Sequence, residues 1–190
     1  MERCNWPASN PLMIQYHDEE WGVPIHDDRK IFEFMVLDAF QAGLSWSTIL
    51  NKRENFRKAF SNFEPGIVAK YSEKKIQALL SDAGIVRNEL KIRSTIKNAG
   101  HFVRIAHEYG SFSEYIWGFV NHKTIINQWA DPKQIPVSTK ESDAMSKALK
   151  KEGFSFVGST ICYSFMQAAG MVNDHTVNCF RHRQLSPRKK

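Results

Sequence analysis

Apolar residues recur at the spacing of α-helices along most of this chain, and no segment keeps the strict alternation that is typical of an amphipathic strand. The pattern is clearest between residues 28 and 42, where one face of the expected helix carries Ile31, Phe34, Met35 and Ala42. Asp38 falls in the middle of that apolar face, whereas Arg29 and Glu33 fall on the other side. A carboxyl group in such a position must be hydrogen-bonded, held neutral or used for function.

Capping residues, prolines and glycines divide the chain into further helices. An Asn-Pro pair at residues 10–11 predicts the start of a short helix that runs to about residue 20. Gly43 ends the helix described above, and Ser45 can cap the next one, which runs to about residue 60. The remaining helices are expected at 72–81, 88–109, 113–120, 138–151 and 159–169, with the N-terminal caps Ser72, Asn88 and Ser113 and a capping box at Ser138–Glu141.

This pattern predicts an all-α chain in which residues 121–137 form a loop. The length suits one domain with a sizeable core, which we place at residues 1–180, followed by a basic tail at residues 181–190. No stretch has the apolar length of a membrane span, and the N-terminus lacks the pattern of a secretory signal. We therefore expect a cytoplasmic protein that does not enter a membrane.

The charge of the chain is compatible with a polyanionic partner. Lys and Arg number 26 against 20 Asp and Glu, a net charge of +6, which suits nucleic acid but is also common in proteins that bind none. The three cysteines argue against a disulfide framework and leave metal binding open.

Two cysteines and two histidines lie near the ends of the chain, Cys4 and His17 near the start and His175 and Cys179 near the end. Two thiolates and two imidazoles are a ligand set that Zn²⁺ prefers, and four protein ligands leave no position for a catalytic water. The spacing of His175 and Cys179 would place both on one face of a helix. One hypothesis is a structural zinc site that joins the two ends; the alternative is four unrelated residues, and spacing alone does not decide.

Residues 147–169 predict two helices joined by a hairpin that has Gly153 and Gly158 at its ends. Backbone N–H groups at a glycine turn, leading into a helix N-terminus, bind phosphate. Lysines at positions 147, 150 and 151 lie close by in sequence. Such a helix-hairpin-helix can anchor a DNA backbone without reading its sequence, and an ordinary αα-hairpin is the alternative.

Aromatic side chains accompany the acid of the helix expected at residues 28–42. Asp38 is followed by Leu44 and Trp46 after the break at Gly43, and an acid, an apolar side chain and a flat ring at this spacing suggest a site for an aromatic ligand. The other aromatic candidates are Trp6, Tyr16 and Trp21. The alternative is a structural aspartate that binds a backbone N–H, with aromatic rings that serve only as core.

Taken together, these residues resemble the 3-methyladenine DNA glycosylase I family. Matching motifs run in order along nearly the whole chain and fail only in the tail; they lie at residues 3–6, 16–24, 41–46, 52–55, 82–85, 119–122, 142–144, 156–168 and 172–175. The resemblance implies an all-α helix-hairpin-helix DNA glycosylase fold with a zinc site between the N- and C-terminal segments. The zinc ligands it implies are Cys4, His17, His175 and Cys179.

The resemblance also implies the activity and its residues. It implies excision of 3-methyladenine from double-stranded DNA by base flipping and hydrolysis, which leaves an abasic site, by a monomeric enzyme without an organic or redox cofactor. Asp38 stands at the catalytic position, and the base pocket falls on Tyr16, Trp46, Trp6 and Trp21. Leu44 matches the residue that fills the gap in the duplex, and we expect DNA contacts at Gln41, Gly43, Gly153 and Gly158.

Two residues depart from the family pattern. The family usually has Glu where this chain has Asp38, and some members have Tyr where it has Met13. Aspartate keeps the charge but is one methylene shorter, so its reach to a bound base is the open question. The alternative functions are therefore a DNA-damage-binding protein of the same fold that has lost catalysis, and a small zinc-stabilised adaptor that binds protein.

Overall fold

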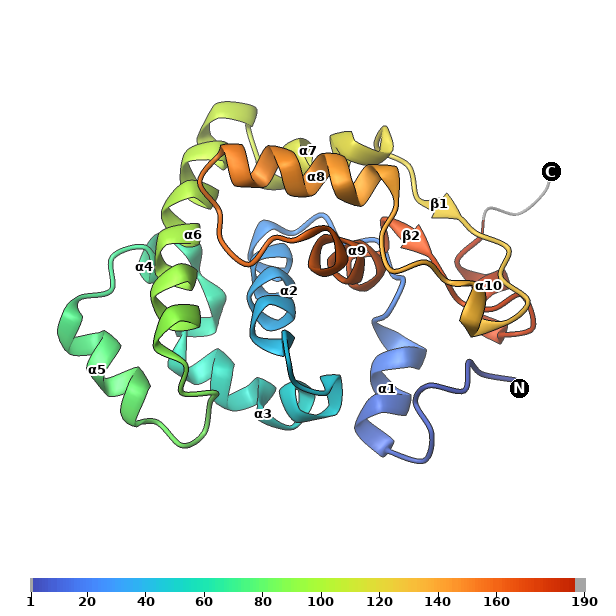
Figure 1. The fold of residues 1–190 in the computed structure, drawn as a ribbon, viewed down its shortest axis with the longest axis horizontal. Coiled ribbons are helices and arrows are strands. Elements are labelled where there is room, and N and C mark those ends of the chain that lie inside the picture. Colours follow the sequence, from blue (N-terminus) through green and yellow to red (C-terminus); the bar gives the residue numbers. More distant parts are fainter. Residues whose placement is uncertain (1, 187–190) are drawn as a thin grey trace.

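The computed structural model describes residues 2–186, and helices dominate this part of the chain (Figure 1). The helices are α1 (Pro11–Glu19), α2 (Asp28–Gln41), α3 (Trp46–Ala59), α4 (Pro65–Val68), α5 (Glu73–Ser81), α6 (Glu89–Tyr109), α7 (Phe112–Trp117), α8 (Lys140–Lys151), α9 (Ser159–Ala168) and α10 (Phe180–Gln184). Short 3₁₀ turns cover Ser61–Phe63, Gly118–Val120 and Pro132–Gln134, and two short strands are β1 (Ile125–Ile126) and β2 (Val172–Asn173). The prediction of a mainly helical chain is confirmed.

Side-chain caps start several helices where the sequence predicts them. The Ser45 hydroxyl accepts a hydrogen bond from the Thr48 backbone N–H at 3.2 Å, and this cap orients the first turn of α3, which begins with Trp46. The side chains of Asn10, Ser72 and Asn88 cap α1, α5 and α6 in the same way.

Two predicted caps are wrong by one or two positions. Ser111, not Ser113, caps α7, because the N–H groups of Phe112 and Ser113 already bind the Asp28 carboxylate at 2.9 and 2.8 Å. The capping box of α8 is formed by Thr139 and Ser142, one position after the predicted Ser138 and Glu141.

Helix α2 lies in the centre of the fold, with α6, α9 and α3 around it (Figure 1). Ile31, Phe34, Leu37 and Phe40 are all 0% exposed. Buried residues occur on nearly every side of the helix rather than on one stripe, and they include Glu33, which the sequence places on the polar side. A helix that is buried all round has neighbours on each face, and α2 therefore acts as the axis of the core.

Helices α8 and α9 form the predicted hairpin, which is fastened to α6. The Asn98 side chain on α6 donates to the Ser155 carbonyl and accepts from the Ser155 N–H, both at 2.9 Å. Gly153 has a φ of +94°, and an added Cβ there would lie 2.8 Å from the His101 ring. Glycine is therefore required at this end of the hairpin by both conformation and space.

The strands β1 and β2 correct the expectation that the chain is purely α-helical. Ile125 pairs with Val172 and Ile126 with Asn173 in parallel register, so the predicted 121–137 loop contains a strand and a 3₁₀ turn. A strand of two residues is too short to show alternation in the sequence. The pairing of β1 with β2 holds the 121–137 segment beside the end of α9.

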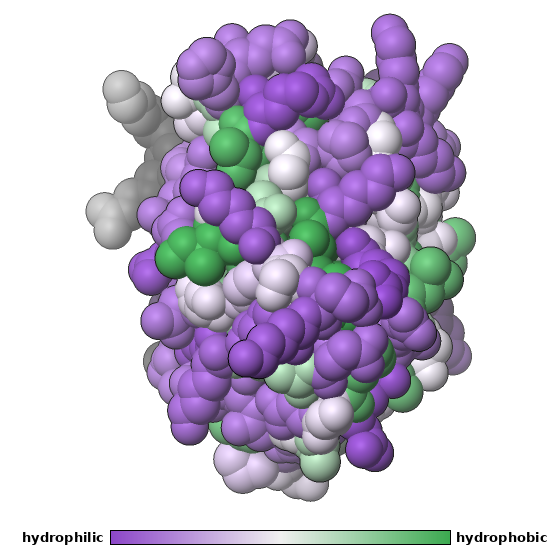
Figure 2. All heavy atoms as spheres, turned by 90° about the vertical axis from the view of Figure 1, so that its left-hand side faces the viewer, coloured by the Kyte–Doolittle hydropathy of each residue, from purple (hydrophilic) through white to green (hydrophobic). Residues whose placement is uncertain are grey.

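The surface on the α4–α6 side is mainly hydrophilic, and Figure 2 shows apolar side chains only in small groups between polar ones. None of the helices in residues 2–186 is long and apolar enough to span a membrane. Helix α10 includes the first residues of the predicted basic tail, among which His182 is buried. Residues 187–190 of this tail lie outside the described part of the chain.

A matched pair of glycine substitutions tests this packing. Gly170 has a φ of +69°, and an added Cβ would lie 2.3 Å from the Val23 carbonyl carbon, so Gly170→Ala should lower the free energy of unfolding by about 2 kcal/mol or more. Gly100 lies inside α6 with open space at its Cβ position, so Gly100→Ala should raise it by roughly 0.5–1 kcal/mol. Urea denaturation measures both, and effects of the same sign would contradict the structure.

Candidate functional site

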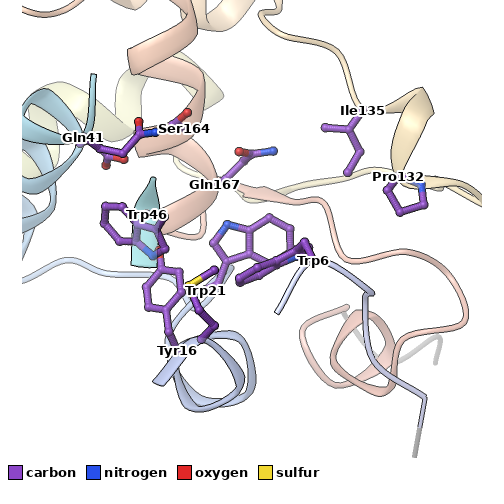
Figure 3. Close-up of a pocket in the computed structure, with 11 residues that line it drawn as sticks. Trp6, Tyr16, Trp21, Gln41, Trp46, Pro132, Ile135, Ser164 and Gln167 are labelled. Atoms are coloured by element: carbon purple, nitrogen blue, oxygen red, sulfur yellow. The ribbon is translucent and has the colours of Figure 1, made fainter. Parts of the chain in front are cut away.

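A cavity of about 460 Å³ opens between α1, α2, α3 and α9 (Figure 3). Its wall includes the acid and the four aromatic residues that the sequence proposes for an aromatic ligand, but not Leu44. The lining residues are Trp6, Met13, Tyr16, Trp21, Asp38, Gln41, Trp46, Pro132, Ile135, Ser164 and Gln167.

The aromatic side chains of this wall pack at steep angles to one another. The ring centroids of Trp6 and Trp21 are 5.1 Å apart with the planes at 74°, and those of Tyr16 and Trp46 are 5.2 Å apart at 52°. Rings held at such angles support one another in the wall of the cavity that they line. The indole N–H groups of Trp6 and Trp46 are buried and have no hydrogen-bond partner among the described residues.

Asp38 is buried in the wall and unpartnered at one oxygen. Asp38 lies near the C-terminal end of α2 and is 4% exposed. Its Oδ2 has no hydrogen-bond partner in residues 2–186. Burial raises the pKa of this carboxyl well above its usual value, because the charged form is poorly solvated there. Burial without a hydrogen-bond partner for Oδ2 therefore favours the neutral form of this carboxyl.

A rigid turn presents Leu44 beside the cavity. Gln41 Nε2 donates to the Leu44 carbonyl at 2.8 Å, and the Leu44 N–H donates to the Gln41 carbonyl at 2.7 Å. Gly43 has a φ of +81°, which a residue with a side chain rarely adopts. Leu44 remains 38% exposed, so an apolar side chain projects from a turn that is fixed by hydrogen bonds.

Lys91 of α6 secures the base of this turn. Its Nζ donates to the carbonyls of Phe40 and Ala42 at 2.9 and 2.7 Å, which are among the last carbonyls of α2 and would otherwise lack partners. A lysine at a helix C-terminus also favours the helix dipole. No pattern in the sequence predicts this contact, since Lys91 stands near the start of a separate helix.

Arg53 on α3 lies in an ion-pair network that the sequence did not reveal. It donates to both carboxylate oxygens of Glu20 at 2.8 Å and to Glu33 at 2.6 Å, and it is only 7% exposed. Because Glu20 ends α1 and Glu33 lies on α2, the network holds three helices of the pocket together.

A second cluster joins the ends of the chain, as predicted. The ligand atoms of Cys4, His17, His175 and Cys179 lie within 4.8 Å of one another, and all four residues are buried. His17 Nε2 and His175 Nδ1 are 3.2 Å apart, and the two sulfurs lie 3.5 to 3.6 Å from His175 Nδ1.

The outer nitrogens of both imidazoles are occupied by acceptors. His17 Nδ1 lies 2.8 Å from the Asp18 carboxylate, and His175 Nε2 lies 3.0 Å from the Trp21 carbonyl. Each outer nitrogen must therefore carry the proton, and the inner nitrogens face each other as lone pairs. Two lone pairs at this distance repel unless a cation lies between them, so this donor set fits a metal ion.

One geometric expectation for this cluster is wrong. His175 and Cys179 are not on a helix, because α10 begins only at Phe180 and Cys179 is its N-cap. A loop brings the two side chains together, with Cys179 Sγ 3.5 Å from His175 Nδ1.

Gly153 and Gly158 lie at the ends of the α8–α9 hairpin and do not line the aromatic cavity.

The aromatic cavity, the buried acid and the fold can be compared with known proteins. Residues 6–182 match the family model described as methyladenine glycosylase. The chain belongs to the methyladenine glycosylase family. The resemblance inferred from the sequence motifs is confirmed.

Members of this family align with almost the whole chain. DNA-3-methyladenine glycosylase 1 of Escherichia coli K12 is 51% identical over 94% of this chain and 96% of its own length. DNA-3-methyladenine glycosylase of Haemophilus influenzae is 45% identical over 93% and 96%. The solved structure of 3-methyladenine DNA glycosylase I from Staphylococcus aureus, described as showing 3-methyladenine recognition, has a TM-score of 0.92, 33% identity, and coverage of 100% of this chain and 99% of that chain.

A pair of arginine substitutions tests the pocket scaffold of this glycosylase-family chain. Arg53→Met should lower the free energy of unfolding by about 2–3 kcal/mol, because it leaves Glu20 without its partly buried counter-charge and Glu33 with Arg57 alone. Arg93→Met removes a similarly connected but exposed arginine, which pairs with Glu73 and Glu89, and should cost less than about 1 kcal/mol. Denaturation curves of both variants check this, and similar losses would show that the Arg53 network is not buried in solution.

Proposed function

We propose that this protein is a DNA glycosylase that releases 3-methyladenine from alkylated double-stranded DNA and leaves an abasic site. The observation that carries the proposal is a buried acid without a partner, Asp38, in the wall of a cavity lined by aromatic rings. Membership of the methyladenine glycosylase family and the activities for which the relatives are named support it.

The cavity suits a flat cation. An adenine methylated at N3 in DNA carries a positive charge, and an aromatic face such as that of Trp46 attracts a cation by on the order of 0.5–2 kcal/mol. Asp38 would release its proton when the cation enters, since a positive charge nearby favours the ionised carboxylate. Tyr16, Trp6 and Trp21 complete the wall on the other sides.

Access to the base requires that the nucleotide leaves the duplex. Flipping costs a few kcal/mol, and an apolar wedge in the vacated space offsets part of that cost. Leu44 has the position and exposure for this role, and its turn, with Gln41 and Gly43, is held by Lys91.

The α8–α9 hairpin is the proposed contact to the DNA backbone. Gly158 precedes the first turn of α9, whose N–H groups have no side-chain cap and can bind phosphate. Lys147, Lys150 and Lys151 are exposed on α8 and add positive charge. With Gly153 at its other end, this hairpin has the arrangement of a helix-hairpin-helix motif.

The reaction needs little assistance to the leaving group. The bond between the sugar C1′ and the base breaks with its electron pair passing to the cationic base, which leaves as neutral 3-methyladenine. Water adds to C1′ and gives one proton to solvent. In a site of low dielectric, the Asp38 carboxylate would stabilise positive charge on the base and on the sugar as the bond breaks.

Zn²⁺ is the ion we propose for the Cys4, His17, His175 and Cys179 cluster. Two thiolates and two imidazoles complete its tetrahedral shell, so its role would be to hold the chain ends together. Burial raises the pKa of the Cys4 thiol to about 11, and a bound cation would reverse this by favouring the thiolate.

We further propose that residues 1–180 act as one domain and that the protein acts as a monomer.

Substitution of Asp38 tests the enzyme proposal. Asp38→Asn should lower the release of 3-methyladenine from methylated duplex DNA by about 100-fold or more, because the amide cannot supply a negative charge. The measurement is the chromatographic analysis of freed bases, with spontaneous release as the baseline. A wild-type protein that binds methylated DNA but frees no base would instead be a non-catalytic damage binder.

The same variant has an expected effect on stability. Because burial raises the folded-state pKa of Asp38, the unfolded state ionises first as the pH rises above about 4. The wild type should therefore lose stability relative to Asp38→Asn as the pH rises from there to the folded-state pKa. Denaturation at several pH values checks this, and a wild type that gains stability over the variant would place the carboxylate in a hydrogen-bonded site.

Cysteine substitutions test the metal. Purified protein should contain about one zinc per chain, and Cys179→Ser should lose the metal and melt at a lower temperature. Cys162→Ser is the matched control, since Cys162 is equally buried but lies outside the cluster and donates only to the Val157 carbonyl. Folded, active protein without metal would exclude the zinc site.

A further inference from the structure

A second buried aspartate lies behind the pocket, and its carboxylate is fully hydrogen-bonded. Asp174, next to β2, is 1% exposed. Its Oδ1 accepts from Asn127 Nδ2 at 2.6 Å and from Trp129 Nε1 at 2.8 Å. Its Oδ2 accepts from the Tyr163 hydroxyl at 2.6 Å and from Gln167 Nε2 at 2.8 Å. Four donors fill the acceptor sites of a carboxylate.

This arrangement determines which end of the Gln167 amide faces the pocket. Because donors approach both of its oxygens, Asp174 acts as an acceptor, and the Gln167 amide must offer its NH₂ group to it. The oxygen Oε1 is then the end left for the cavity, which Gln167 lines. In Figure 3 the Gln167 oxygen points toward the side on which Ser164 and Trp46 lie, and its nitrogen toward the side of Ile135.

The pocket thus contains a second oriented acceptor besides Asp38. The aromatic rings take the faces of a bound base, and polar groups on the wall must meet its edges. An adenine cation presents an exocyclic amino group with two N–H donors, which need two acceptors. A methylated guanine presents a carbonyl oxygen at that place, which an oriented acceptor repels.

We propose that Gln167 is a specificity-determining residue, whose Oε1 accepts a hydrogen bond from the exocyclic amino group of 3-methyladenine and disfavours 3-methylguanine. Asp174 is the positioning residue that keeps the amide in this orientation. The inference rests on the proposed glycosylase function and names the group of the base that is read.

An Asp174→Asn substitution should reverse the amide without dismantling the network. The new side-chain oxygen can still accept from Asn127 and Trp129. Its NH₂ group replaces Oδ2 and can donate to the Tyr163 hydroxyl and to Gln167 Oε1. Gln167 would then present its NH₂ group to the pocket, where it favours a carbonyl oxygen over an amino group.

The experiment compares the release of 3-methyladenine and 3-methylguanine from one sample of methylated duplex DNA. Gln167→Met, which keeps the length but has no acceptor, should lower the preference for 3-methyladenine by about tenfold, a change on the order of one hydrogen bond. Asp174→Asn should lower this preference further than Gln167→Met does. Gln77→Met is the matched control and should change nothing, since Gln77 is exposed on α5 and pairs with Glu73 in a similar amide–carboxylate contact.

Binding of the two free bases, followed by quenching of the pocket tryptophans, separates the possible failures. A wild type that binds 3-methyladenine but releases none would overturn the proposed function, while the affinities of the variants would still test Gln167. An unchanged preference in Gln167→Met would overturn the inference. Equal losses for both bases with unchanged affinities would also overturn it, because Oε1 would then serve the attacking water. Melting temperature and zinc content check whether Asp174→Asn folds. If that variant does not fold, the result for Gln167→Met alone decides the inference.

Discussion

The burial of α2 on nearly every side is the constraint on which the other elements depend. A helix with Ile31, Leu37 and Phe40 fully enclosed needs partners all round, and α3, α6 and α9 supply them. Near the end of this helix, Asp38 and Gln41 face the aromatic cavity. The core is therefore also the scaffold of the site, and the precision of the pocket derives from the density of the packing around α2.

Two buried aspartates show how the surroundings of a carboxyl decide its role. Asp174 accepts four hydrogen bonds, ties the 121–137 segment to α9, and has no capacity left for a ligand. Asp38 has an oxygen without a partner and opens onto aromatic rings. The first is satisfied and rigid, and the second carries a cost that only a ligand can relieve.

Local signals in the sequence predicted most of the helices, because caps and glycine stops act within a few residues. Ser45, Gly43 and Asn88 are examples whose effect does not depend on the rest of the fold. The β1–β2 pairing was missed because it joins two residues to two others 47 positions away, as the Ile125–Val172 register shows. The motifs brought Tyr16, Trp46 and Asp38 into one proposal. The role of Gln167 could not be predicted in this way, because the orientation of its amide depends on Asp174 and on the residues that surround that carboxylate.

Trp21 connects the aromatic wall to the Cys/His cluster. The Trp21 ring lines the cavity, and its carbonyl oxygen lies 3.0 Å from His175 Nε2. His175 is 158 positions after His17 and 171 after Cys4. During synthesis Trp21 therefore leaves the ribosome long before His175, and the contact between them forms only after residue 175 has emerged. The pocket of a nascent chain therefore lacks this support until the residues after β2 have been made.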